Sequence, residues 1–138
     1  YWEFQPIWAL PILISYFVFL LFYLKNSGSY KNWPVYKWMW FTGLVFYAFI
    51  FIENYLWIFP YFKEHLMADM TIQWKVNGSI VGAINQMIYG LAFYLMIKIS
   101  GNEKMATSKL AFAMYFLGLF NLMFNWGHHI YILLKSTP

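Results

Sequence analysis

Four long apolar stretches constrain this chain more than any other feature of its sequence. A helix needs roughly 20 apolar residues to cross about 30 Å of hydrocarbon, and each stretch reaches about that length. They run from about Gln5 to Leu24, Trp38 to Phe59, Ile80 to Ile99 and Leu110 to Leu134. We therefore expect an all-α polytopic membrane protein, a single domain over residues 1–138 with four transmembrane helices.

The composition agrees with a lipid environment. Hydrophobic residues make up 62% of the 138 residues and charged residues only 10%, too little polar surface for a water-soluble globule of this size. The chain has no cysteine, which excludes disulfides, thiolate metal sites and cysteine nucleophiles. Its lysines are scattered near the ends of the spans, so the expected partners are the lipid bilayer and other membrane subunits, with no nucleic acid.

The segments between the spans predict the orientation. Residues 25–37, 60–75 and 100–109 are expected to be loops, because Gly, Ser, Asn and Pro gather there with the charges. The first and third loops, with the adjoining end of the third span, hold six lysines, and the opposite side holds three. Cytoplasmic loops are enriched in Lys and Arg, so both termini are predicted on the outer, periplasmic side of a bacterial inner membrane. The six are Lys25, Lys31, Lys37, Lys98, Lys104 and Lys109, and the three are Lys63, Lys75 and Lys135.

Polar residues recur at helical spacing within two of the spans. On the fourth span they are Asn121, Asn125, His128 and His129, and on the third they are Asn77, Asn85 and Tyr89. Spacings of four, seven and eight residues place each set on one helix face, so we expect two polar stripes that face each other. Such stripes either hold helices together by hydrogen bonds or line a site.

The histidine pair and one carboxylate are the candidate chemical groups. Adjacent histidines on a helix point about 100° apart, so His128 and His129 suit a single metal ion better than opposite faces of a haem. Copper or iron is the candidate metal. Glu53 lies in the second span near its outer end, where it fits a proton relay, an ion pair with lysine, or a structural carboxylate.

Residues 74–132 resemble two consecutive helices of the catalytic subunit of heme-copper oxidases, in particular the nitric oxide reductase and cytochrome-cbb-type branch. The resemblance is carried by "FNWGHHIY", in which Gly127, His128, His129 and Tyr131 match a helix that ends in Gly-His-His and an aromatic residue. In that family this pair supplies two of the three histidines of a non-haem copper or iron that faces a haem iron. The preceding helix, which ends in "LAFYLMIKISG", is similar in length and in its glycine stop.

The same resemblance implies an incomplete metal site. Asn77 stands where the family places its third metal-binding histidine, and Val81 and Asn85 stand where nitric oxide reductases place carboxylates. An amide oxygen is a poor ligand for copper, which favours imidazole nitrogen. Any haem would be bound by other chains, and this chain is not expected to be catalytic alone.

Three functions remain open at the level of the sequence. The first is a membrane component of a respiratory electron-transfer complex, as a fragment, split half or degenerate relative of the oxidase subunit. The second is an accessory or structural membrane subunit of a larger complex. The third is a small ion-transport subunit with Glu53, the asparagines and the histidines along the path. Co-purifying haem favours the first function, a colourless complex with a large partner favours the second, and ion flux in liposomes favours the third.

Overall fold

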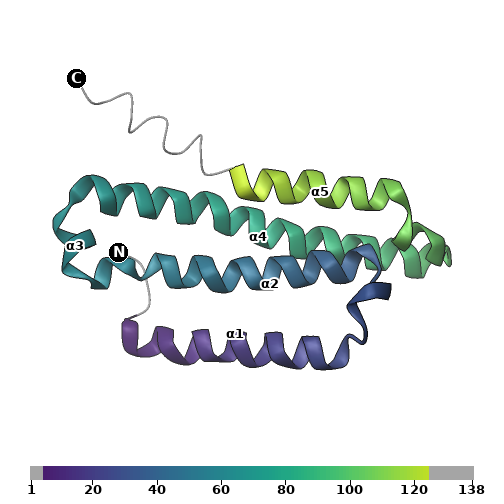
Figure 1. Ribbon diagram of the computed structural model, residues 1–138, viewed down its shortest axis with the longest axis horizontal. Helices are drawn as coiled ribbons and strands as arrows, with labels where there is room; N and C mark the ends of the chain where they lie inside the picture. The colour runs from purple at the N-terminus through teal and green to yellow at the C-terminus, as the bar shows by residue number, and fades with distance from the viewer. Residues whose placement is uncertain (1–4, 125–138) are drawn as a thin grey trace, which may run out of the picture.

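The computed structural model describes residues 5–124, except for the side chains of Trp57 and residues 66–77. Within this range every regular element is helical, which confirms the all-α expectation. Five α-helices follow in order: α1 (Pro6–Asn26), α2 (Val35–Asn54), α3 (Pro60–Glu64), α4 (Leu66–Ser100) and α5 (Lys109–Phe124) (Figure 1). Short 3-10 turns lie between them at Tyr30–Asn32, Leu56–Ile58 and Glu103–Thr107.

Three helical segments are long and apolar enough to cross a membrane. They are Pro6–Asn26, Val35–Asn54 and Gly78–Ser100, close to the first three predicted spans. The fourth predicted span, Leu110–Leu134, is described only as far as Phe124, and α5 is a shorter apolar helix within that range. The remainder of this span lies outside the described residues.

The boundaries of α2 differ from those predicted. The helix begins at Val35 because Pro34 needs no hydrogen bond from its own nitrogen and can therefore precede the first turn. It ends at Asn54, five residues before the predicted Phe59. The Tyr55 N–H bonds to the Ile52 carbonyl in a tighter turn, and Pro60 disfavours helical backbone at the residue before it.

The segment predicted as a loop over residues 60–75 is largely helical, which corrects that prediction. The short helix α3 occupies Pro60–Glu64, and α4 begins at Leu66, 14 residues before the predicted Ile80. The segment "LMADMTIQWKVN" contains neither glycine nor proline, so nothing in it interrupts the helix that continues into the span. At the other end, α4 stops at Gly101, whose φ of +67° is the left-handed conformation common after helices.

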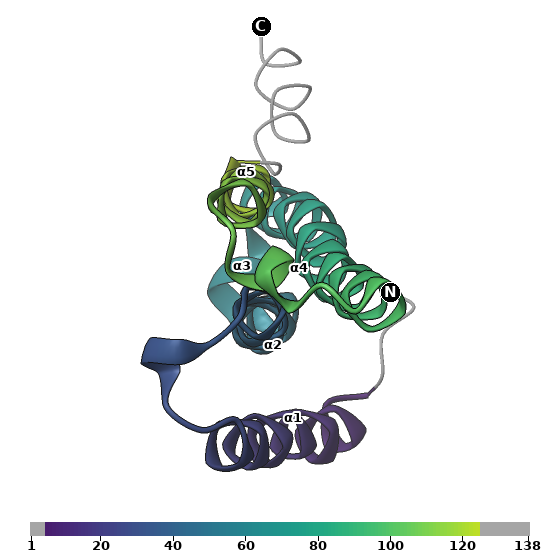
Figure 2. The same cartoon turned by 90° about the vertical axis from the view of Figure 1, so that its right-hand side faces the viewer.

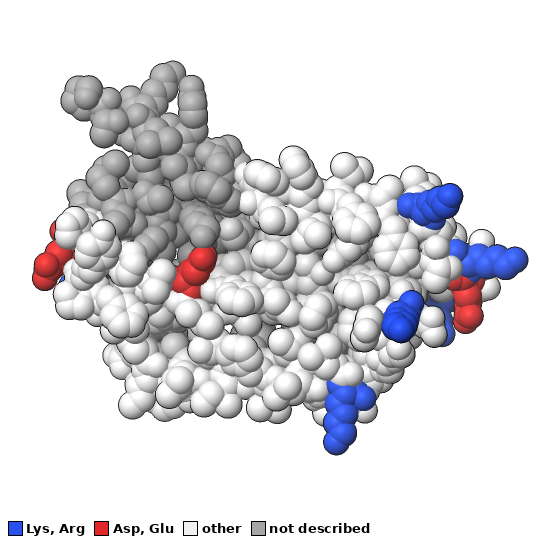
Figure 3. Space-filling view, viewed as in Figure 1, with Lys and Arg blue, Asp and Glu red and all other residues white. Residues whose placement is uncertain are grey.

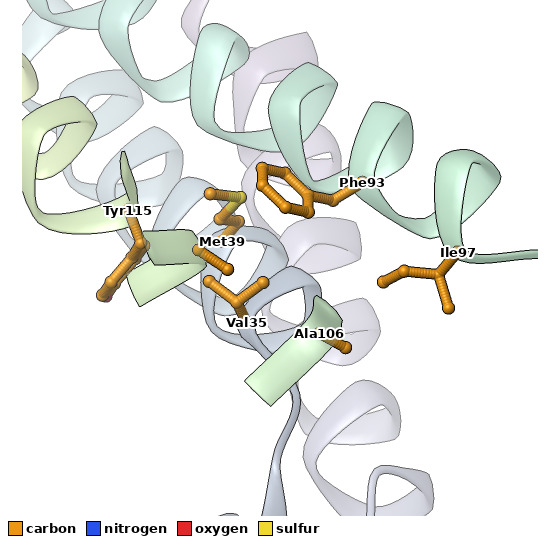
Figure 4. Close-up of a cluster of buried hydrophobic side chains, with 7 residues drawn as sticks. Val35, Met39, Phe93, Ile97, Ala106 and Tyr115 are labelled. Carbon is orange, nitrogen blue, oxygen red and sulfur yellow. The ribbon is translucent and has the colours of Figure 1, made fainter. Parts of the chain in front are cut away.

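Helices α2, α4 and α5 form the packed core of the described structure. Their shared cluster contains Val35 and Met39 of α2, Phe93 and Ile97 of α4, and Tyr115 of α5 (Figure 4). Glycines allow the helices to approach closely, as expected where packing drives association in lipid. A Cβ on Gly82 of α4 would lie 2.7 Å from Leu122 of α5, and one on Gly90 would lie 2.7 Å from Trp40 of α2.

Helix α1 packs mainly on α2 and leaves most of its surface exposed (Figure 2). The tilted rings of Tyr16 and Tyr47 pack with 4.7 Å between their centroids, and the Tyr23 hydroxyl donates to the Lys37 carbonyl at 2.8 Å. The connection to α2 is tied down by Trp33, whose Nε1 donates to the Ser27 carbonyl at 3.0 Å. The loop between α1 and α2 is therefore a fixed part of the fold.

The loops after α1 and after α4 lie at the same end of the bundle (Figure 1). Lysine side chains gather at this end together with an acidic side chain, and further acidic side chains lie toward the opposite end (Figure 3). The orientation is predicted from the lysines at this end. The assignment of the lysine-rich end to the cytoplasm remains a prediction.

Candidate functional site

The predicted metal-binding residues lie largely where the structure gives no side-chain description. Asn125, His128 and His129 lie outside the described residues. Asn77 belongs to α4, but its side chain is not described. Among the side chains that are described, no three His, Cys, Asp or Glu residues lie close enough to hold a metal ion. The copper or iron site at the histidine pair therefore remains a prediction.

The described polar residues of the two predicted stripes lie on α4 and α5. Asn85 is half-buried, whereas Tyr89, one helical turn later, is exposed. Asn121 is exposed on α5. Tyr89 and Asn121 line one cavity, so each stripe contributes a polar side chain to the same space.

This cavity, which we call the α4–α5 cavity, has a volume of about 380 Å³. Three helices contribute to its walls, and most of the lining side chains are apolar. Several are methionines or aromatic residues. The residues lining it are Met39 of α2, Tyr89, Ala92, Phe93 and Met96 of α4, and Met114, Leu117, Gly118 and Asn121 of α5.

Gln86 is a buried polar residue that the sequence analysis missed. Its side chain is 1% exposed, and neither amide atom has a hydrogen-bond partner in the described part of the chain. The amide lies against α5, because a Cβ on Gly118 would be 2.7 Å from Gln86 Nε2. Gln86 directly follows Asn85, about 100° around the helix, so a search along the Asn77, Asn85 and Tyr89 stripe passes it by.

The sequence analysis also missed a polar pair that joins α2 to α5. The hydroxyls of Thr42 and Tyr115 are 2.7 Å apart and both side chains are buried. A single tyrosine in an apolar span gives no indication of its partner, since the pairing depends on how two helices align. The pair satisfies two polar groups in the core without charge.

Glu53 lies beside a separate cavity near the other end of the bundle. This cavity has a volume of about 300 Å³, and α2, α4 and α5 all contribute to its lining. Glu53 and the buried Ser79 are its polar lining residues, with Phe46, Phe49, Ile50, Leu122 and Met123 around them. The structure therefore places the Glu53 carboxylate at the edge of the three-helix core.

Comparisons with protein families, curated proteins and solved structures found no match. The fold alone defines the class: over residues 5–124 the regular elements are all helical, and three helical segments are long and apolar enough to span a membrane. Within the described residues the α4–α5 cavity is formed by three helices, and the buried Gln86 amide packs against one of its lining residues, Gly118.

Proposed function

We propose that the chain is a membrane component of a respiratory electron-transfer complex in a bacterial inner membrane. In this proposal it resembles part of a heme-copper oxidase or nitric oxide reductase catalytic subunit with an incomplete metal site. His128 and His129 are its candidate metal ligands, and partner subunits carry the haem. The chain supplies helices to the complex and is not catalytic alone.

Membership of a larger complex is supported by the exposed position of Asn121. This residue lies 12 positions after Lys109, the first residue of α5, which is about 18 Å along the helix. That distance reaches the middle of a hydrocarbon core about 30 Å thick. An exposed amide at this depth is costly in lipid, so a partner helix with a hydrogen-bonding group over Asn121 accounts for it.

The electron-transfer part of the proposal is supported by the resemblance in residues 74–132. The Gly127, His128, His129 and Tyr131 pattern agrees with a helix that bears two metal-binding histidines. Asn77 in place of a third histidine argues against tight copper binding. A degenerate centre beside a haem-bearing partner fits both observations.

The test is purification of the tagged full chain from its native membranes in a mild detergent. We expect haem absorption bands and partner subunits to co-purify with the wild-type chain. Asn121→Leu should lose most of the haem and the partners, because the amide that binds the partner helix is gone. Phe120→Leu, at the exposed neighbouring position, is the matched control and should retain both.

Two results would contradict the electron-transfer proposal. A colourless complex with a large partner would make the chain an accessory subunit. A monodisperse monomer, unchanged by Asn121→Leu, would remove the support for a partner. Metal analysis of the same samples measures copper and iron, and stoichiometric metal lost on His128→Ala would reveal a third ligand.

Ion transport is the second candidate, and the cavity beside Glu53 favours it. A carboxylate and the hydroxyl of Ser79 lining one cavity between three helices is an arrangement suited to proton or cation passage. The test is flux through liposomes that contain the purified chain. Flux that falls on Glu53→Gln supports this function, and absence of flux in the wild-type chain contradicts it.

A further inference from the structure

A row of aromatic rings that ends in a lysine lies between α2 and α4, near the lysine-rich end of the bundle. Tyr36 and Trp40 are one turn apart on α2, and the Tyr94 ring of α4 contacts both, with centroids 5.4 and 5.7 Å away. The Lys98 ammonium, one turn after Tyr94, lies 5.7 Å from the centre of the Tyr94 ring. We call these four residues the Lys98 cluster.

The Lys98 ammonium is available to an anion from outside the chain. Its side chain is exposed, and it forms no ion pair with any residue that the structure describes. Attraction to the face of the Tyr94 ring holds the ammonium in place but does not neutralise its charge. The cluster therefore presents a positioned and uncompensated cation.

The surroundings of the cluster are also positively charged. The six lysines of this end are accompanied by one described carboxylate, that of Glu103, and none of them forms an ion pair with it in the described structure (Figure 3). The Lys37 ammonium donates to the Ser27 carbonyl at 2.9 Å, which leaves its charge in place. Charges of one sign repel one another, and an anion bound among them offsets this repulsion.

The depth of the cluster matches the boundary between hydrocarbon and lipid head groups. The apolar segment Gly78–Ser100 has 23 residues and is about 34 Å long, so its last turn lies at the edge of a hydrocarbon core about 30 Å thick. Lys98 belongs to that turn, and Tyr94 and Trp40 lie about one turn deeper. Trp and Tyr are enriched at this boundary. An anion at Lys98 therefore lies at the level of phospholipid phosphate groups.

An apolar stripe leads from Lys98 into the span. Leu91, Leu95 and Lys98 lie at i, i+4 and i+7 on one face of α4. Leu91 is 50% exposed and Leu95 is 48% exposed, so neighbouring helices leave this face partly open. A ligand here meets a positive charge at the surface and apolar side chains below it. This combination fits an amphipathic anion better than a soluble anion or an acidic protein segment, which would use only the charge.

We propose that the Lys98 cluster binds an anionic phospholipid of the surrounding leaflet. The Lys98 ammonium binds the phosphate, and an acyl chain lies along Leu91 and Leu95. A lipid with a net negative charge is preferred over a zwitterionic one, because the other lysines of this end attract the net charge and repel a choline group. This inference goes beyond the proposed function and needs neither haem nor a partner subunit.

The test is competition between two lipids for the purified full chain. The chain in mild detergent is mixed with equal amounts of phosphatidylglycerol and phosphatidylcholine, and native mass spectrometry measures the lipid retained. We expect phosphatidylglycerol to be retained in preference. Lys98→Gln should weaken its binding about fivefold, as expected for one lysine near anionic head groups, whereas Lys98→Arg keeps the charge and should bind like wild type.

Two further variants control for the loss of a positive charge. Lys25→Gln removes a lysine from the same end of the molecule, but on α1, which packs mainly on α2. Lys63→Gln removes one from α3 at the opposite end. Both lysines are exposed, like Lys98, and both variants should retain phosphatidylglycerol like wild type. Thermal unfolding followed by circular dichroism verifies that each variant is folded.

Three results would overturn the proposal. The first is equal retention of the two lipids by the wild-type chain. The second is a loss of phosphatidylglycerol on Lys25→Gln as large as that on Lys98→Gln, because binding would then follow the charge of the whole end. The third is displacement of the lipid by excess inorganic phosphate, which would show that the site takes the free anion. Since no haem or partner is involved, these outcomes are independent of the purification test above.

Discussion

At the scale of single residues, the Thr42–Tyr115 hydrogen bond gives a measurable link between α2 and α5. The two hydroxyls are 2.7 Å apart in a buried environment. We predict that Tyr115→Phe and Thr42→Val each destabilise the bundle, and that the two effects are coupled by about 0.6 kcal/mol, the average for such bonds in membrane helices. Unfolding in mixed detergent micelles, followed by tryptophan fluorescence, measures all three variants.

The double variant decides whether the bond itself is responsible. It should be less destabilised than the sum of the single changes, because neither hydroxyl is then left without its partner. Tyr94→Phe is the control, since Tyr94 lies on α4 and contacts the rings of Tyr36 and Trp40. Strict additivity of Tyr115→Phe and Thr42→Val would show that the hydrogen bond between Thr42 and Tyr115 makes no net contribution to the free energy of unfolding.

Residue-level predictions from the sequence rest on residue type alone, and a functional role for these residues stays a prediction. Asn85 and Asn121 were recognised because amides are rare in apolar spans. Gln86 carried the same signal but lay off the chosen stripe, and its burial depends on Gly118 of another helix. The pattern of a single sequence does not show how two helices align with each other. Neither this contact nor the α4–α5 cavity could therefore be predicted.

At the scale of elements, the contact between α4 and α5 depends on Gly82. A Cβ at this position would lie 2.7 Å from Leu122 Cδ1 and 3.1 Å from Leu122 Cα. The backbone of α5 cannot yield as a side chain does, so Gly82→Ala should push the two helices apart. We predict a loss of about 1–3 kcal/mol of unfolding free energy, typical of overpacking a tight core, measured by the same fluorescence assay.

Val81→Ala is the matched control for this helix contact. Val81 precedes Gly82 on α4 and is 51% exposed, so its truncation leaves the contact intact and should change stability little. A Gly82→Ala protein as stable as the wild type would mean that α5 is free to shift. It would also show that the close approach at Leu122 is not needed for folding.

Helix existence was easier to predict than helix boundaries. Hydropathy located three spans because long apolar runs dominate the sequence. The start of α4 was missed because residues 66–77 mix charged and apolar residues, which resembles a loop when hydropathy is the only guide. Propensity was the informative signal there, since the segment has no helix-breaking residue.

At the scale of the whole molecule, orientation is the property most directly tested. The native chain has no cysteine, so single cysteines can be introduced freely. We predict that Ser29→Cys and Asn102→Cys, in the two lysine-rich loops, resist a membrane-impermeant maleimide in intact cells and react after lysis. Tyr61→Cys, at the opposite end, should react in intact cells, because positive loops stay in the cytoplasm.

The reverse labelling pattern would show that the orientation is the opposite of the one predicted. Labelling of only one lysine-rich loop would contradict the fold, in which both loops lie at the same end. Exposure is matched at the three sites, since Ser29, Tyr61 and Asn102 are all exposed. Differences in reactivity therefore report the side of the membrane and not burial within the protein.

The unbroken course of α4 has a mechanical consequence. Its 35 residues form a rod of about 52 Å, whereas the hydrocarbon core is only about 30 Å thick. The apolar part begins at Gly78, so the first 12 residues extend the rod beyond the span. We expect a sideways push on that extension to tilt α4 where it packs against α2 and α5. We expect movement outside the lipid to change the contacts of α4 within the bundle, among them the packing of Gln86 against Gly118 of α5.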